Sequence, residues 1–517
     1  MLLRMTHGPA TPESRATAQT AAPAARVAAA DIGDPGDRGD ETAGLWSPAR
    51  RGLTIGLVLT VTLVAFETLA IATIMPIVTR ELGDLHLYGW VFSAFFLGTL
   101  LGTVLLGGMA DRRGLVLPFG LGLGLFAVGL VAGGAAPSMA ILVAARFVQG
   151  LGAGAISPIA YVAIGRTLPE QLRAQMFAVL STAWVLPGLL GPAIAGVVGE
   201  LAGWRIVFLG LLPLIALSGG LTFSSLGRIP EATRPDGSPH EEIVFPHRVR
   251  NAFLIVGGAG LATAGLTSVS IVPGIPLVLV GLLITIQAFR RLTPPGTLRA
   301  SAGLPAAVLL RGILTYGFFV ADAYVPFALQ DWRGTSATVS GIALTAATLA
   351  WSGGAWVQAR GIATVGARRF VRLGFTTVLV GIAGFAAVLS PAVPVAVGIV
   401  AWALAGLGMG FAYSTLSLVT LREAPAGQEG SATSALQLSD VLGTALGAGV
   451  GGALIAGAIA LGLEAWWGLA AAFAVGAVAH AGGVALSGRL PGRLADVEAA
   501  VRPGPAGSAT TAPTRSR

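Results

Sequence analysis

Long apolar stretches, separated by short polar connections, run through most of this chain. From Leu53 onward, most of them reach the about 20 residues that a helix needs to cross a bilayer. The pattern therefore predicts a series of membrane-spanning helices. Six lie in the first half, at 53–77, 88–108, 115–136, 139–164, 174–199 and 206–226. Six more lie in the second half, at 304–329, 337–359, 373–391, 394–420, 432–458 and 465–487.

A further apolar segment, 251–291, lies between these two sets and is interrupted at Pro273-Gly274-Ile275-Pro276. Arginines flank it on both sides, namely Arg248, Arg250, Arg290 and Arg291. If both clusters face the cytoplasm, the chain crosses the membrane an even number of times between them. Two helices, 251–271 and 274–290, satisfy this condition, and a re-entrant hairpin would satisfy it too. We predict two helices, which brings the number of spans to fourteen.

The composition supports a membrane protein. Hydrophobic residues make up 54% of the 517 residues, and charged residues only 11%, against about 25% in soluble domains. So few charges cannot cover a water-exposed surface, which excludes a soluble enzyme and a disordered chain and leaves an integral membrane protein. The predicted fold class is therefore all-α and membrane-embedded.

The residue types that are missing exclude several kinds of chemistry. The chain has no cysteine and no lysine, so all 32 basic residues are arginine. This excludes disulfides, thiolate metal sites, Schiff bases and the P-loop lysine of an ATP-driven pump. We therefore expect no cofactor and no use of ATP. The net charge of +8 does not indicate nucleic-acid binding, because the arginines form short clusters between apolar stretches.

The arginines instead predict the orientation in the lipid bilayer. With both termini in the cytoplasm, 20 arginines lie in or beside cytoplasmic connections. Only 3 lie outside, which are Arg80, Arg205 and Arg333. Cytoplasmic loops of membrane proteins carry such an excess, so we expect a multi-pass protein with both termini inside. The alanine- and glycine-rich, lysine-free composition points to a bacterial source and hence to the bacterial inner membrane.

The same pattern divides the chain into five parts. Residues 1–50 and 491–517 lack apolar periodicity and are predicted to be disordered cytoplasmic tails. Residues 51–228 form an N-terminal six-helix bundle and 303–490 a C-terminal one. The linker 229–302 carries the two extra helices.

Five charged residues fall well inside predicted spans, where ionisable groups are costly and by default mark ion or substrate paths. They are Glu67, Arg146, Arg311, Asp322 and Asp440. Counting about 1.5 Å per residue, Glu67 and Arg146 lie at similar depths in the outer half of the first bundle and could meet. Arg311 and Asp440 form a possible second pair nearer the cytoplasm. The alternative is that these charges are structural ion pairs or reach a membrane surface.

A carboxylate that alternately gains and loses an arginine partner in a low-dielectric cavity can bind and release a proton. Glu67 with Arg146 is therefore the predicted proton-coupling pair. Asp322 and Asp440 are secondary candidates for binding a proton or a cationic substrate. Five aromatic residues within spans either line a substrate cavity or pack against helices and lipid: Trp184, Tyr316, Tyr324, Trp351 and Tyr413.

Several short motifs match one family. LVAARFVQGLGAG (142–154) resembles the fourth-helix arginine motif of the major facilitator superfamily, with Arg146 and Gln149 at the motif's positions. GGMADRRG (107–114) resembles its signature loop, but Leu115 and Val116 follow where the family has basic residues. The matching residues of this loop are Gly107, Asp111, Arg112 and Gly114.

Two more motifs are similar to those of antiporters in this superfamily. PGLLGPAIAG (187–196) resembles the fifth-helix antiporter motif, through Gly188, Gly191, Pro192 and Gly196, with Ala195 in place of a glycine. FETLAIATIMP (66–76) is similar to the first-helix motif of drug:proton antiporters, with Glu67 where aspartate is commoner. QARGIATVGARR (358–369) looks like a degraded copy of the signature loop in the second half.

The resemblance implies the fourteen-helix drug:proton antiporter branch. Its fold has two six-helix bundles of inverted three-helix repeats and two extra central helices. It implies a monomer that exports small amphipathic or aromatic compounds in exchange for protons, driven by the proton gradient. Asp111 with Arg112 would gate the cytoplasmic side, and the glycines of 187–196 would bring the fifth helix close to a neighbour. Ordinary helix packing and solvated loop charge are the alternatives for these two motifs.

Three other functions remain open from the residues. A proton-coupled uptake symporter would have the same fold, although the antiporter-like stretch 187–196 argues against it. A multi-span membrane enzyme would need paired catalytic groups near a membrane face, which the sequence lacks. A membrane sensor or scaffold would not need buried charges.

Overall fold

The computed structural model describes residues 44–48, 50–169, 172–173, 175–176, 179–180, 183–226, 239–268, 271–425 and 428–492, without the side chains of 111–113, 239–245 and 271. Every regular element in these residues is helical. The chain divides into two units, Met1–Arg51 and Gly52–Arg517, and apart from Arg51 the helices belong to the second. The tails predicted at 1–50 and 491–517 lie almost wholly outside the described residues.

The first half contains seven described helices. They are α3 (Arg51–Leu82), α4 (Tyr88–Arg113), α5 (Val116–Gly134), α6 (Met139–Thr167), α8 (Val185–Leu201), α9 (Trp204–Leu209) and α10 (Leu212–Leu226). The span predicted at 206–226 is interrupted between α9 and α10, because Pro213 has no N–H to donate to the carbonyl of Leu209. Helix α8 begins at Val185 rather than at 174, and part of 174–184 lies outside the described residues.

The middle segment forms two long helices, α11 (Pro239–Leu266) and α12 (Ile271–Leu292), as the two-helix prediction requires. The predicted break at 273–276 is wrong, since the helix runs through it. Pro273 lies in the first turn of α12, where backbone N–H groups have no helical partner in any case. Helix α11 ends instead at Leu266, and Thr267 begins a turn.

The second half begins with a broken helix. Helix α13 (Leu304–Asp322) is followed by the single turn α14 (Val325–Phe327) and a π-helical turn, η4 (Ala328–Trp332). Five long helices follow: α15 (Ala337–Val365), α16 (Ala367–Ala386), α17 (Val395–Glu423), α18 (Glu429–Ala460) and α19 (Ala465–Leu486). Short 3₁₀ turns occur at η2 (Leu85–Leu87), η3 (Thr297–Arg299), η5 (Ala387–Leu389) and η6 (Ser487–Arg489).

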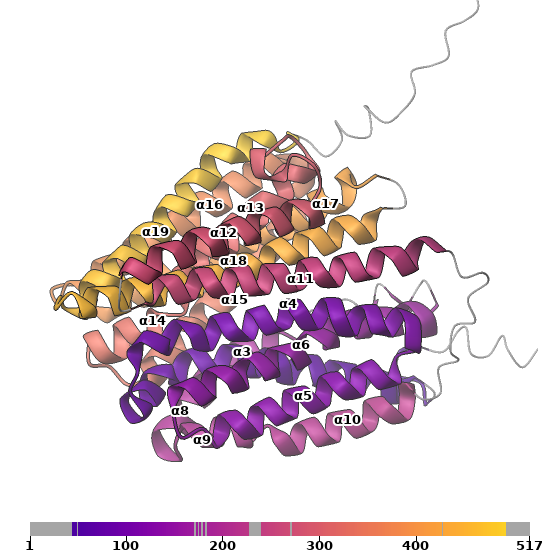
Figure 1. The fold of residues 1–517 in the computed structure, drawn as a ribbon, viewed down its shortest axis with the longest axis horizontal. Helices are drawn as coiled ribbons and strands as arrows, with labels where there is room; N and C mark the ends of the chain where they lie inside the picture. Colours follow the sequence, from indigo (N-terminus) through magenta and orange to yellow (C-terminus); the bar gives the residue numbers. More distant parts are fainter. Residues whose placement is uncertain are drawn as a thin grey trace, which may run out of the picture. The chain divides into compact units, whose positions relative to one another are not determined.

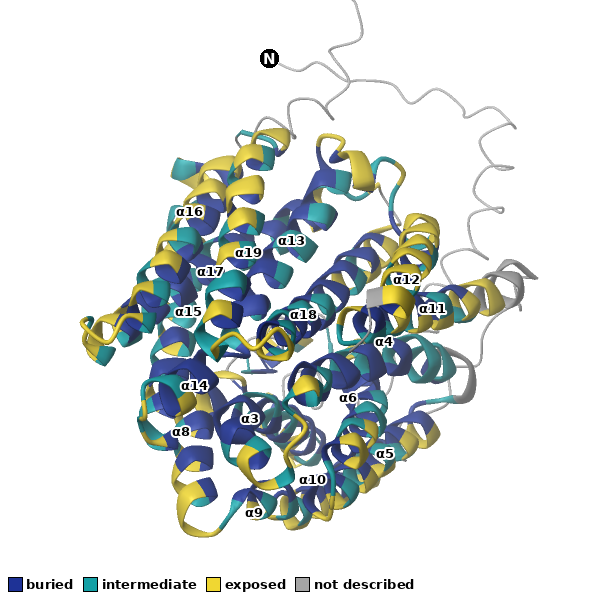
Figure 2. Ribbon diagram, turned by 60° about the vertical axis from the view of Figure 1, so that its left-hand side comes forward, coloured by how far each residue is buried: buried dark blue, intermediate teal, exposed yellow. Residues whose placement is uncertain are grey.

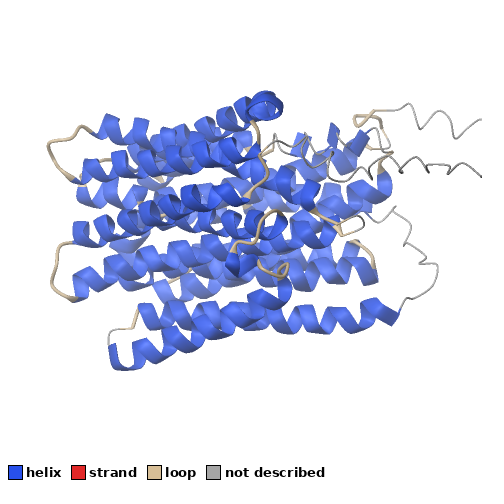
Figure 3. Ribbon diagram, turned by 90° about the horizontal axis from the view of Figure 1, so that it is seen from above, coloured by secondary structure: helices blue, strands red, loops and turns tan. Residues whose placement is uncertain are grey.

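Fourteen helical stretches of the described chain match the fourteen predicted spans. Twelve are long and apolar enough to cross a membrane by length and composition. Helix α8 is shorter, with 17 residues, and α15 has 29 residues but a less apolar sequence. The helices lie alongside one another (Figure 3), and large apolar side chains such as Val272 and Val478 are exposed on them. Such a surface suits lipid rather than water.

The helices of each half pack in the same pattern. In the first half α6 packs against α4 and α5, and in the second half α17 packs against α15 and α16. Between the halves, α4 packs against α18, and α8 packs against α15. Helix α11 packs against α12, α4 and α18 (Figure 1).

Burial separates central from peripheral helices. In the most apolar part of α18, 67% of the residues are buried, but in α12 only 28%. Figure 2 shows the same contrast, with exposed positions along α12 and α16. Helices α4 and α18 therefore form the centre of the structure, and α12 lies on its outside.

Candidate functional site

Glu67 of α3 and Arg146 of α6, predicted to meet, form a buried ion pair. Each residue is 1% exposed. Nη1 of Arg146 donates to Oε1 of Glu67 and also, at 2.6 Å, to Oε1 of Gln149. Nε donates to the backbone carbonyl of Val91 at 3.3 Å. The guanidinium also lies over the ring of Phe95, 4.1 Å from its centre.

This cluster is not fully satisfied. Among the described residues, Oε2 of Glu67 and Nε2 of Gln149 are buried without a hydrogen-bond partner. A buried polar atom without a partner costs about 1–3 kcal/mol. The carboxylate therefore has room for one more partner, such as a proton.

Glycines in α6 explain why Arg146 points into the bundle. A side chain at Gly150 would collide with the carbonyl of Phe95 in α4. One at Gly152 would collide with Gly122 and Phe126 in α5. Helix α6 can therefore pack closely against both helices, which holds the arginine one turn earlier in the interior.

The second predicted pair, Arg311 and Asp440, meets at a tyrosine instead of directly. The guanidinium of Arg311 stacks on the ring of Tyr413, 3.4 Å from its centre, and donates to the hydroxyl of Ser417. Tyr413 donates its own hydroxyl proton to Oδ2 of Asp440 at 2.7 Å. Nε and Nη1 of Arg311 are buried without a partner in the described part of the chain.

Asp322, the last residue of α13, accepts a hydrogen bond from Nε1 of Trp402 at 3.1 Å. The ring of Phe318 stacks on Trp402 with centres 5.2 Å apart. No arginine or histidine of the described chain lies within ion-pair distance of Asp322. By contrast, Glu67 pairs with Arg146, and Asp440 is linked to Arg311 through Tyr413.

Small residues close both junctions between the halves. A side chain at Gly188 of α8 would collide with Thr348 of α15, and one at Gly341 would lie 2.5 Å from the carbonyl of Pro192. Gly196 packs against Ala337 in the same way, whereas Gly191 faces Phe66 of α3 within the first half. At the other junction, Gly89 of α4 and Gly452 of α18 pack directly against each other.

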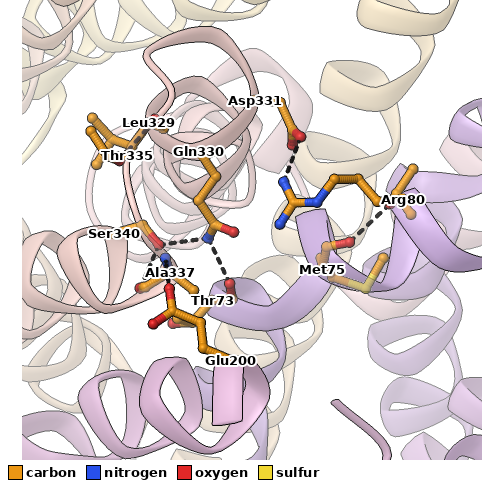
Figure 4. Close-up of polar contacts among 11 residues, drawn as sticks. Thr73, Met75, Arg80, Glu200, Leu329, Gln330, Asp331, Thr335, Ala337 and Ser340 are labelled. Carbon is orange, nitrogen blue, oxygen red and sulfur yellow. Dashed lines mark hydrogen bonds and ion pairs between the residues drawn. The ribbon is translucent and has the colours of Figure 1, made fainter. Parts of the chain in front are cut away.

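Polar contacts also join the halves at one end of the helices, which we call the α3–α4 end because α3 is followed there by α4. Arg80 forms an ion pair with Asp331 at 2.8 Å, and Nε2 of Gln330 donates to the carbonyl of Thr73 at 2.8 Å (Figure 4). Glu200 accepts hydrogen bonds from the backbone of Ala337 and the hydroxyl of Thr338, at 2.5 and 3.1 Å.

The sequence did not reveal these contacts. Arg80 and Asp331 are 251 positions apart, and each looks like an ordinary loop charge. Only their positions near the ends of apolar stretches on the same predicted side of the membrane could have suggested that they meet.

The comparison with known families decides the identity. The model of the Major Facilitator Superfamily matches residues 57–448, which is well over half of the chain. The chain belongs to the major facilitator superfamily. It is therefore a membrane transporter, not an enzyme, and its fold is the major facilitator fold.

Several relatives in this superfamily carry transporter names. Two Mycobacterium tuberculosis proteins named as multidrug-efflux transporters are each 28% identical over 424 residues, 78% of this chain and 87% of theirs. Multidrug resistance protein 3 of Bacillus subtilis is 29% identical over 166 residues, 32% of each chain.

Solved structures show the same fold. A bacterial homolog of the human lysosomal transporter Spinster aligns with a TM-score of 0.59 at 16% identity, over 86% of this chain and 98% of its own. A POT family transporter in complex with 5-aminolevulinic acid aligns with a TM-score of 0.62 at 14% identity, over 85% and 96%. At such identities the likeness concerns the fold alone.

The superfamily's signature loop is described only in part. The backbone of Asp111 and Arg112 belongs to the last turn of α4, but their side chains lie outside the described residues. Gly107 packs near Pro158 of α6, and Gly114 ends α4 with φ of 76°, a value that favours glycine.

No group of three or more histidine, aspartate or glutamate side chains in the described chain could hold a metal ion.

Proposed function

We propose that this major facilitator is a proton-coupled antiporter that exports small amphipathic or aromatic compounds by alternating access. The observation that carries the proposal is the buried cluster of Glu67, Arg146 and Gln149, in which one carboxylate oxygen has no partner. The multidrug-efflux names of the mycobacterial relatives support export of drug-like compounds.

Protonation of Glu67 changes the contacts of this cluster. The neutral acid no longer attracts the guanidinium, so Arg146 keeps Gln149 and the Val91 carbonyl as its partners. Helix α3 is then less strongly held to α6. Proton release restores the ion pair, and the two states of the pair can thus bias two arrangements of the bundle.

The orientation follows from the arginine distribution. The α3–α4 end faces outward and both termini lie in the cytoplasm of a bacterium. The contacts of Arg80, Gln330 and Glu200 with the opposite half then form an outer gate, which is closed in this structure. Asp111 with Arg112 is the corresponding cytoplasmic gate in this proposal. The close glycine contacts of α8 let the halves pivot at the α8–α15 junction.

The proposal predicts that Glu67→Gln abolishes proton-driven efflux, because the amide cannot take up and release a proton. We would measure efflux of a fluorescent dye from cells or vesicles with an imposed pH gradient. Glu464→Gln is the matched control, since Glu464 is exposed and its side chain caps no helix. Undiminished gradient-driven efflux by Glu67→Gln would contradict the assignment of Glu67. Proton influx accompanied by dye uptake would instead identify a symporter.

A further inference from the structure

The two halves share a sequence repeat that places Trp402 where the first half has Arg146. RFVQGLGAG (146–154) in α6 aligns without gaps with WALAGLGMG (402–410) in α17. The three glycines coincide, so that Gly150, Gly152 and Gly154 correspond to Gly406, Gly408 and Gly410. Leu151 also matches Leu407, and polarity changes only at Arg146, which aligns with Trp402, and at Gln149, which aligns with Ala405.

The packing of the glycines shows that the two stretches occupy equivalent places. A side chain at Gly150 would meet the carbonyl of Phe95 in α4, and one at Gly406 would meet the carbonyl of Ala347 in α15. Gly102 approaches the carbonyl of Leu151, and Gly354 approaches that of Leu407. Position 146 in the first half is therefore the structural counterpart of position 402 in the second.

In both halves the residue at this place donates to a carboxylate on the first helix of its own half. Arg146 donates to Glu67 of α3, and Nε1 of Trp402 donates to Asp322 of α13 at 3.1 Å. The carboxylates are not strict counterparts. Gly191 faces Phe66 as Gly447 faces Tyr316, which makes Gly317 the counterpart of Glu67. Asp322 lies five residues further along, about 7.5 Å of helix.

The replacement leaves Asp322 without a cation. An indole is a neutral donor and cannot balance a carboxylate as a guanidinium does. Titratable side chains beside the second half of α13 include Tyr316 on the helix itself, His480, which faces Gly317 from α19, Tyr324 in the next turn, and Tyr88, whose hydroxyl donates to the carbonyl of Ala323 at 3.4 Å. None is an arginine.

The end of α13 strengthens this imbalance. Pro326 has no N–H for the carbonyl of Asp322, and α13 ends at this residue. The partial negative charge at a helix C-terminus favours a cation and disfavours an anion. Asp322 is also partly accessible, whereas Glu67 is 1% exposed, so a proton can reach it more easily.

We propose that Asp322, held by Trp402, is a second proton-binding residue of the transport cycle. The inference rests on the proposed antiport function. Together, Asp322 and Glu67 let each transport cycle exchange two protons for one substrate molecule. Export of a monovalent cationic dye against one proton moves no net charge, but against two protons it moves one charge inward. The membrane potential alone then drives export.

The site can be tested without transport. Infrared difference spectra of the purified protein, recorded during a pH titration, follow the carbonyl band of protonated carboxylic acids. A band lost in Asp322→Asn and in Trp402→Arg, but kept in Trp402→Phe, supports the assignment, because the introduced arginine would hold Asp322 ionised. A spectrum unchanged by Asp322→Asn overturns it. If the band is present but the wild type shows no proton-driven efflux, the proposed function fails and the proton site stands.

The stoichiometry is tested by transport. In right-side-out vesicles, an interior-negative potential is imposed with valinomycin in the absence of a pH gradient, and efflux of a monovalent cationic dye is followed. We expect Asp322→Asn to lose potential-driven efflux but to retain efflux driven by a pH gradient, whereas Glu67→Gln loses both. If the Asp322→Asn variant shows potential-driven efflux at the wild-type rate, the proposal is overturned. The proposal is also overturned if the Asp322→Asn variant loses the efflux that a pH gradient drives.

Discussion

The buried charges of the first half, Glu67 and Arg146, share one cluster of contacts. Arg146 is shared between Glu67, Gln149 and the Val91 carbonyl, with Phe95 beneath it. Two charges brought out of water gain little over a well-packed apolar pair, but removing one of them leaves the other uncompensated. The pair is therefore costly to break from either side.

We predict that Glu67→Ala destabilises the protein by about 3–5 kcal/mol, the usual cost of leaving one buried charge of a pair alone. Thermal unfolding of the purified protein in detergent measures the effect. The double variant Glu67→Gln with Arg146→Gln removes both charges and should recover most of the loss. Equal unfolding temperatures for Glu67→Ala and the wild type would show that Arg146 is stabilised by its other contacts alone.

Residue depth could be predicted from the sequence, but side-chain direction could not. Counting residues from the helix ends placed Glu67 level with Arg146, and the two do form an ion pair. The same counting placed Arg311 level with Asp440, yet Tyr413 lies between them. Height along a helix follows from a fixed rise per residue, whereas rotation about the helix axis depends on packing against neighbours.

At the scale of helices, glycines decide which elements approach one another. The α8–α15 junction has glycine on both sides, with Gly188 on one helix and Gly341 on the other. Small residues let backbones come close, and close contact is the main source of helix association in a membrane. Gly341 is the better position to test, because its neighbour is the backbone of Pro192, whereas Gly188 faces a side chain that can rotate away.

We predict that Gly341→Ala weakens this junction by about 1–3 kcal/mol, the usual cost of overpacking. The added methyl carbon would lie 2.5 Å from the carbonyl oxygen of Pro192. Gly353→Ala is the matched control on the same helix, since nothing lies within 4 Å of its added carbon. Unfolding temperature and dye efflux should both fall in Gly341→Ala and hold in Gly353→Ala. If both variants change the unfolding temperature and the dye efflux by the same amount, the α8–α15 junction is not tightly packed at Gly341.

Helix boundaries could be predicted where an apolar stretch was uninterrupted, but the predictions failed at prolines. The span at 139–164 lies within α6, and the span at 394–420 lies within α17 except for Pro394, which is its N-cap. The breaks before Pro213 and Pro326 were missed, although an interior proline removes a helical hydrogen bond. The break predicted at 273–276 did not occur: Pro273 falls in the first turn of α12, and the helix also continues past Pro276. Pro76, Pro158 and Pro192 lie inside helices without ending them, so a proline does not by itself define a helix boundary.

In the whole molecule, the two halves touch through an apolar layer and a polar layer. Glycine contacts join α4 to α18 and α8 to α15, and side-chain bonds tie the halves at the α3–α4 end. Helix α11 packs against both α4 and α18 and so covers the α4–α18 junction. Neither the pairing of α4 with α18 nor that of Arg80 with Asp331 could be predicted, since the contacting residues are 352 positions apart in one case and 251 in the other.

The polar layer predicts how the gate responds to charge. In the proposed orientation, Arg80→Asp places two carboxylates at the outer gate and favours its opening. An exposed ion pair is worth about 0.2–1 kcal/mol, so losing it shifts the ratio of open to closed by up to about fivefold, and repulsion adds to this. Because the chain has no cysteine, Leu344→Cys on α15, which is 5% exposed here, gives a single labelling site.

We expect a membrane-impermeant maleimide to label Leu344→Cys faster from outside when Arg80→Asp is present. Adding Asp331→Arg restores the attraction with the charges exchanged and should return labelling to the slow rate. Glu81→Gln is the control, because Glu81 pairs with Arg205 within the first half and its loss leaves the gate intact. Labelling that stays fast after the charges are exchanged would mean that Arg80 acts through contacts other than Asp331, and the ion pair would then not be the gate.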